Sequence, residues 1–186
     1  YYLANVVRDL RGHVAKPRSM LINMSRFVKV QSVIKEYVDE IQDNFIRTIK
    51  YNFDEDGSKN VHLSLFQALK HLWDKHFNNV TDINFADIVK KKNLLGAVYD
   101  IERDIPKMNI IVVNGNSASK LDYKSNPSLR VIAIGGLALS RGLTLEGLLV
   151  SYFYRNTATF DVLMQMGRWF GYRPHYDDLF QIWTSQ

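Results

Sequence analysis

Val131-Ile-Ala-Ile-Gly-Gly-Leu-Ala-Leu-Ser-Arg-Gly-Leu-Thr-Leu-Glu-Gly147 is the most informative segment of the chain. It begins as an apolar, β-branched run, meets two glycines, and continues through a short turn into Ser-Arg-Gly. A continuous apolar run without alternation is typical of a parallel strand that is covered on both faces. Glycine N–H groups can approach a phosphate because no Cβ blocks them, but a purely structural strand-to-helix turn has the same composition. The segment therefore predicts a buried strand that ends in a candidate phosphate-binding turn.

Other segments repeat the strand pattern and alternate with helical ones. Apolar residues recur with helical spacing from Val30 to Ile49 and again from Leu65 to Phe77. A lead helix is expected over residues 1–12 and a weaker helix near Phe85. Further strands are expected at Met20–Met24, Asn109–Val113, Leu148–Tyr154 and Leu179–Trp183. The pattern predicts an α/β fold, with a parallel sheet, flanking helices and a mostly helical insertion.

Composition narrows the class of protein. The chain has 186 residues, no cysteine and a formal net charge of +5. A disulfide framework and a cysteine-based zinc site are therefore excluded. The longest apolar run, Val131–Leu139, is too short for a membrane span, and the first residues lack the pattern of a signal peptide. We expect a cytoplasmic protein without a membrane partner.

The basic excess lies near the beginning of the chain. Residues 1–30 contain six basic side chains and only one acidic one, and the rest of the chain is balanced. Such an excess is typical of a contact with a polyanion, but also of a solvated helix end. The six are Arg8, Arg11, Lys16, Arg18, Arg26 and Lys29.

Several catalytic motifs are missing from the sequence. It contains no Gly-x-x-x-x-Gly-Lys-Ser/Thr loop, no His-Glu-x-x-His pair and no Gly-x-Ser-x-Gly elbow. His71 and His76 are read as ordinary helix residues, and no metal site is assigned. This chain is not expected to hold a triphosphate or a magnesium ion by itself.

A second informative segment is Gln165-Met-Gly-Arg-Trp-Phe-Gly-Tyr-Arg173. Asp161, Gln165 and Arg168 fall at i, i+4 and i+7, so a helix would present them on one face. Arg168 and Arg173 could then place two guanidinium groups on a polyphosphate. Alternatively, these arginines form salt bridges to Asp177 and Asp178.

Together, the two segments resemble motifs V and VI of superfamily-two helicases. More narrowly, they are similar to the Z1 (Z-one) domain, which carries an endonuclease label in helicase-like bacterial proteins. Arg8–Gly12 and Met20–Phe27 fit the lead helix and first strand of that family. The resemblance implies a RecA-like second lobe formed by residues 19–50 and 108–186, a lead helix and linker over 1–18, and a helical insertion over 51–107.

The resemblance also implies roles for individual residues. In this family, the second lobe closes on ATP with Mg²⁺, which is held mainly by an N-terminal RecA-like lobe of the same parent protein. The implied catalytic residues are Gln165, Arg168 and Arg173, and either arginine could be the arginine finger, although Arg173 aligns with the final arginine of the motif. The implied nucleotide contacts are Arg141, Gly142, Leu143 and Thr144. For contacts with nucleic acid, with DNA favoured over RNA, the resemblance implies Ser25 and Arg26, the basic excess adds Arg18 and Lys29, and the glycine-rich strand end adds Gly135 and Gly136.

Thr144 departs from the family pattern, because many helicases have an aspartate there that contacts the ribose. The predicted function is the second lobe of a nucleic-acid-dependent, helicase-like ATPase in bacterial DNA repair or in restriction and defence. Two alternatives stay open. One is an endonuclease domain, for which the sequence offers no carboxylate constellation; the other is a protein-interaction module that uses the helices of 51–107.

Overall fold

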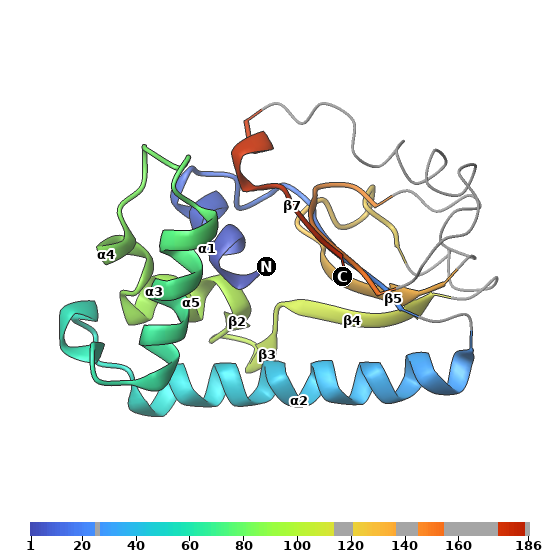
Figure 1. The fold of residues 1–186 in the computed structure, drawn as a ribbon, viewed down its shortest axis with the longest axis horizontal. Helices are drawn as coiled ribbons and strands as arrows, with labels where there is room; N and C mark the ends of the chain where they lie inside the picture. Colours follow the sequence, from blue (N-terminus) through green and yellow to red (C-terminus); the bar gives the residue numbers. More distant parts are fainter. Residues whose placement is uncertain (25–26, 114–120, 137–144, 155–174, 185–186) are drawn as a thin grey trace. The chain divides into compact units, whose positions relative to one another are not determined.

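The computed structural model describes residues 1–24, 27–113, 121–136, 145–154 and 175–184 (Figure 1). The helices are α1 (Tyr2–Leu10), α2 (Val28–Asn52), α3 (Ser64–His76), α4 (Phe85–Ile88) and α5 (Lys91–Val98), with 3-10 helices at Gly57–Asn60 and Asp177–Leu179. The strands are β1 (Arg18–Asn23), β2 (Tyr99–Asp100), β3 (Ile105–Pro106), β4 (Met108–Val113), β5 (Arg130–Gly135), β6 (Leu148–Phe153) and β7 (Gln181–Thr184). The predicted mixture of helices and apolar strands is confirmed.

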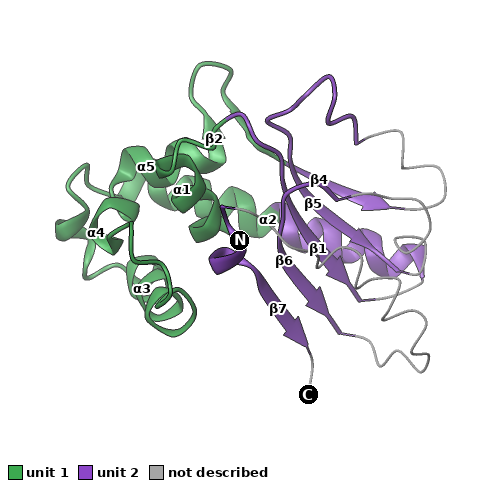
Figure 2. Cartoon of the chain, turned by 90° about the horizontal axis from the view of Figure 1, so that it is seen from above, with its two compact units in different colours: residues 1–14, 40–108 green, residues 15–39, 109–186 purple. Residues whose placement is uncertain are grey.

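The chain divides into two compact units (Figure 2). The first unit contains residues 1–14 and 40–108, and the second contains residues 15–39 and 109–186. Helix α2 contributes to both units. The predicted insertion, 51–107, falls inside the first unit, and the predicted domain boundaries stay predictions.

The second unit is built on a five-stranded parallel sheet with the order β4-β5-β1-β6-β7. The central strand, β1, pairs in parallel with β5 on one side and with β6 on the other. All six residues of β5 are buried, which explains why its sequence is continuously apolar after Arg130. The predicted parallel sheet with covered faces is therefore confirmed.

One buried hydrophobic cluster of the second unit lies on one face of this sheet. In β1, Leu21 is fully buried and lies opposite Ala133 of β5 and Ser151 of β6. Because side chains two residues apart share a face, the alternate residues of each strand meet in one layer. The buried cluster consists of Leu21, Val113, Leu129, Val131, Ala133, Leu145 and Leu148.

The amino edge of the sheet is closed by backbone and hydroxyl contacts. The Ser19 N–H donates to the Gly147 carbonyl at 2.9 Å, and the Ser19 hydroxyl donates to the Glu146 carbonyl at 2.7 Å. The Ser19 hydroxyl also lies 3.1 Å from the hydroxyl of Tyr123, whose pKa is raised because the phenol is buried. Gly147 has a φ of +65°, and the chain passes very close to Pro17 at this point. These contacts fix the segment that leads into β6.

Helices and a short hairpin form the first unit. Helix α1 packs against α5, and the ring of Tyr2 stacks on Phe45 with centroids 4.3 Å apart. Arg11 binds Asp82 through two hydrogen bonds of 2.8 and 2.7 Å. Strands β2 and β3 pair antiparallel. None of the described helices is long and apolar enough to cross a membrane.

Candidate functional site

The carboxyl ends of the three central strands form the candidate site. The last residue of β1, Asn23, lies opposite Gly135 of β5 and Phe153 of β6 in the strand registers. The N–H of Tyr154 donates to the Asn23 carbonyl at 3.0 Å, which holds the end of β6 beside the end of β1. Three strands therefore end at the same level of the sheet.

The strand order makes the carboxyl edge of the sheet the expected place for a ligand. From β1 the chain continues to β4, on one side of the sheet, and from β6 it continues to β7, on the other side. The connections that leave the neighbouring strands β1 and β6 therefore run in opposite directions. In open parallel sheets, ligands bind outside the carboxyl ends of strands at such a switch point. The expected ligand position is next to Asn23 and Phe153.

Two of the predicted site residues are found at this edge. Gly135 ends β5 and Gly136 follows it, and both are buried. Nine other predicted site residues lie outside the described residues. They are Ser25, Arg26, Arg141, Gly142, Leu143, Thr144, Gln165, Arg168 and Arg173.

The two remaining predicted nucleic-acid contacts, Arg18 and Lys29, lie at opposite ends of β1. Arg18 begins the strand and is fully buried, whereas Lys29 is exposed in the first turn of α2, after the end of the strand. A six-residue strand is about 20 Å long, so these two charges cannot serve one phosphate contact. We retain Lys29 for this site and leave Arg18 out, because its side chain lies inside the protein.

Asn23 and Ser151 are site residues that the sequence analysis missed. Both are buried, and they project from the same face of the sheet, because Ser151 lies opposite Leu21, two residues before Asn23. Within the described part of the chain, the Ser151 hydroxyl has no hydrogen-bond partner. The sequence does mark Ser151, because it is the one serine within the otherwise apolar run Leu148–Phe153.

Ser151→Ala is expected to leave the free energy of unfolding unchanged or to raise it by up to about 1 kcal/mol. The reason is that a buried hydroxyl without a partner loses its hydration on folding and gains nothing in return. Ser19→Ala is the matched control, because Ser19 is equally buried in the same sheet but hydrogen-bonds Glu146. It should lower stability by about 1–2 kcal/mol. Denaturant titration of both variants measures the difference, and an equal loss in both would contradict the assignment.

Apart from Lys29, the described residues of the edge contribute neutral groups. Asn23 and Ser151 carry amide and hydroxyl groups, and Gly135 contributes backbone. Such groups can donate hydrogen bonds to a sugar or phosphate oxygen but do not supply the charge that a metal needs. Among the described residues, no group of three His, Asp or Glu side chains could hold a metal ion.

Comparison with known proteins gives one match. A family model described as the Z1 domain matches residues 1–186, which is the whole of this chain. No curated protein and no solved structure matches it.

Proposed function

The chain belongs to the Z1 domain family, and on that premise we propose that it acts as the second RecA-like lobe of a nucleic-acid-dependent, helicase-like ATPase. In this proposal, the N-terminal lobe of the same parent protein holds ATP, Mg²⁺ and the attacking water. The present chain contributes an arginine finger to the γ-phosphate and contacts the nucleic-acid backbone, with DNA favoured over RNA.

One observation carries the proposal: the segments that contain the predicted motifs all leave the same edge of the sheet. Ser25 and Arg26 follow β1, the segment 137–144 follows Gly136, and the segment 155–174 follows Tyr154. The strands before them, β1, β5 and β6, are neighbours in the sheet. In this proposal, a nucleotide and a nucleic-acid strand are both bound by segments that start at these three strand ends.

The neutral groups at the edge are consistent with a second lobe that does not bind the metal itself. Phosphoryl transfer depends mainly on positioning and on stabilisation of the developing charge. If the first lobe binds the metal and the ground-state phosphates, the second lobe needs only backbone donors, neutral hydrogen-bonding groups and its arginines. Gly135 supplies backbone, and Asn23 and Ser151 supply neutral hydrogen-bonding groups.

The nucleic-acid contact can be tested on the chain alone. Each Lys–phosphate contact releases about one counterion, so affinity falls with salt in proportion to the number of contacts. Lys29→Gln is expected to reduce the slope of log affinity against log salt by about 0.7 for a 20-nucleotide single strand. Fluorescence anisotropy over a salt series gives this slope.

Lys16→Gln is the matched control for this experiment. Lys16 is also exposed and has the same charge, but it precedes Pro17 and β1 and so belongs to the amino edge of the sheet. Its substitution should leave the slope unchanged. Equal effects of the two substitutions would show that the chain attracts the polyanion through its overall charge, and would contradict a contact at the carboxyl edge.

A further inference from the structure

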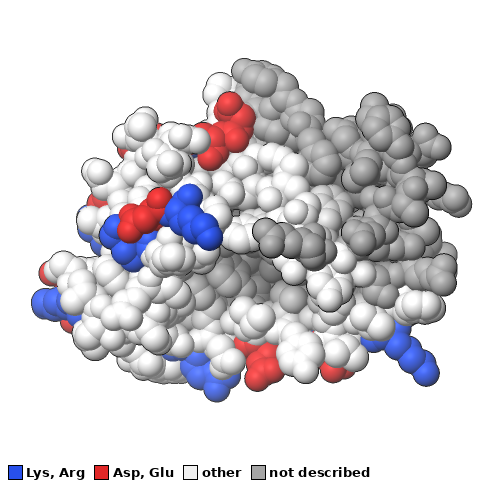
Figure 3. All heavy atoms as spheres, in the orientation of Figure 1, with Lys and Arg blue, Asp and Glu red and all other residues white. Residues whose placement is uncertain are grey.

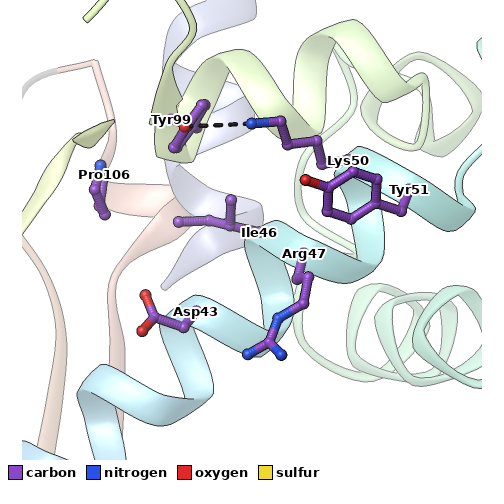
Figure 4. Close-up of a pocket in the computed structure, with 7 residues that line it drawn as sticks. All are labelled: Asp43, Ile46, Arg47, Lys50, Tyr51, Tyr99 and Pro106. Atoms are coloured by element: carbon purple, nitrogen blue, oxygen red, sulfur yellow. Dashed lines mark hydrogen bonds between the residues drawn. The ribbon is translucent and has the colours of Figure 1, made fainter. Parts of the chain in front are cut away.

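A groove of about 370 Å³ opens on the first unit, between α2 and the β2–β3 hairpin (Figure 4). Ile46 and Tyr99 line it and are almost fully buried, at 7% and 8% exposure. Pro106 of β3 lines the same groove, and Figure 4 shows Ile46 directed toward the side on which Pro106 lies. The groove therefore has an apolar floor.

A polar network holds one wall of the groove in place. The Lys50 ammonium donates to the Tyr99 hydroxyl and to the Asp104 carboxylate, both at 3.4 Å. The Tyr99 hydroxyl donates to the same carboxylate. The ammonium also lies over the Tyr99 ring, 4.9 Å from its centroid. Lys50 is thus engaged by groups of the protein, and its charge is balanced by Asp104.

Two other charged side chains that line the groove do not form such an ion pair with another described residue. Asp43 and Arg47 are exposed residues one turn apart on α2, and both line the groove. Among the described residues, neither has an ion-pair partner. The Arg47 guanidinium donates only to the neutral amide oxygen of Asn44, at 3.2 Å. Within the described part of the chain, the apolar floor is therefore flanked by one carboxylate and one guanidinium that are not ion-paired.

The charges of the side chains that line the groove indicate which kind of ligand it could bind. The lining carries Asp43 and Arg47, and the pair of Lys50 with Asp104 adds no net charge. On the face that Figure 3 draws, acidic and basic side chains of the described residues are interspersed, and the groove lining likewise carries both signs of charge. A polyanion such as nucleic acid gains no net attraction from such a surface, because phosphate binding depends on excess positive charge. A ligand with both charges and an apolar part is complementary to it.

We propose that this groove binds a short peptide segment of a partner protein, in which an apolar side chain is flanked by one basic and one acidic residue. The apolar side chain occupies the floor over Ile46 and Pro106. The basic residue contacts Asp43, and the acidic residue contacts Arg47 with the paired donors of the guanidinium. Tyr51, 72% exposed at the rim, adds aromatic contact area. This inference is independent of the proposed ATPase role, which concerns the other unit.

The test uses the 186-residue chain and four capped tripeptides that share a central leucine and differ in the charges that flank it. They are Lys-Leu-Glu, Lys-Leu-Lys, Glu-Leu-Glu and Gln-Leu-Gln. Binding is followed by the amide chemical shifts of residues 43–51 and 99 in two-dimensional NMR spectra. Exposed ion pairs each contribute about 0.2–1 kcal/mol, so the mixed-charge peptide should bind about two- to fivefold more tightly than each of the others.

Charge reversal then has to redirect the preference. Asp43→Lys should make Glu-Leu-Glu the best ligand, and Arg47→Glu should make Lys-Leu-Lys the best ligand. Glu40→Lys is the control, since Glu40 lies on the same helix, is exposed and does not line the groove; it should leave the order of affinities unchanged. The proposal is overturned if no peptide shifts these amides, if reversal leaves the preference unchanged, or if an octathymidylate shifts the same amides more strongly than the peptides do.

Discussion

Gly147→Ala is expected to lower the free energy of unfolding by about 3 kcal/mol or more. A Cβ at this position would lie 1.9 Å from the carbonyl oxygen of Pro17 and 2.5 Å from its carbonyl carbon. Neither backbone can move away easily, because Gly147 accepts the hydrogen bond of Ser19, and Arg18 donates to Leu129. The φ of +65° adds a further penalty for any residue with a Cβ. Thermal unfolding should therefore shift downward by roughly 6–12 °C.

Substitutions at two other glycines distinguish the steric clash from the backbone penalty in this loss of stability. Gly12 has a φ of +78° but no atom within 4 Å of an added Cβ, so Gly12→Ala tests the backbone penalty alone, about 1 kcal/mol. Gly96 lies in α5 with an ordinary φ and open space, so Gly96→Ala should be neutral or stabilising by up to about 1 kcal/mol. A Gly147→Ala variant no less stable than Gly12→Ala would show that the close approach to Pro17 is wrong.

Arg173→Ala, in a parent protein that contains both lobes, is expected to lower kcat for ATP hydrolysis by about 10³-fold or more. Under the proposed function, this guanidinium acts on the charge that develops as the γ-phosphoryl group leaves. ATP affinity should change little, because the first lobe still binds the ground-state phosphates. Arg173→Lys should not restore activity, since an ammonium lacks the planar pair of donors that spans two oxygens.

Arg168→Ala is the comparison that identifies the finger, because the sequence motif leaves both arginines open. The alternative role, a salt bridge to Asp177 or Asp178, predicts a lower melting temperature and an unchanged kcat in the folded fraction. Those aspartates belong to the 3-10 helix before β7, at the amino edge of the sheet. Melting temperature, ATP affinity and kcat for each single variant distinguish the roles. A stable variant that keeps its turnover is not the finger.

The sequence predicted the framework well wherever apolar runs were long. The strands at Met20, Asn109, Val131 and Leu148 and the helices at Val30 and Leu65 are all confirmed. Helix α5 was not predicted, because it begins with Lys91-Lys92, contains Gly96 and buries Leu94, Leu95, Ala97 and Val98, so that no amphipathic spacing marks it. The β2–β3 hairpin was missed for a similar reason, since strands of two residues carry no pattern.

The candidate site was less predictable because a sequence does not state which charges become buried. Arg18 counted as one of six basic residues near the amino terminus, yet it begins a central strand and lies inside the protein. Conversely, Asn23 and Ser151 carry no motif, and their proximity follows only from the pairing of β1 with β6. Strand order, rather than composition, brings these polar groups to one edge.

The position of β1 at the centre of the sheet also has a consequence for biosynthesis. Arg18 pairs with Arg130 and Met20 with Val150, so the partners of this strand leave the ribosome more than a hundred residues after it. At about 5–20 residues per second, the nascent β1 waits roughly 5–25 s for them. Residues 40–108, which complete the first unit, emerge during this interval. If that unit folds first, it replaces a long flexible loop by a compact body, and the entropy lost when β1 meets β5 and β6 is correspondingly smaller.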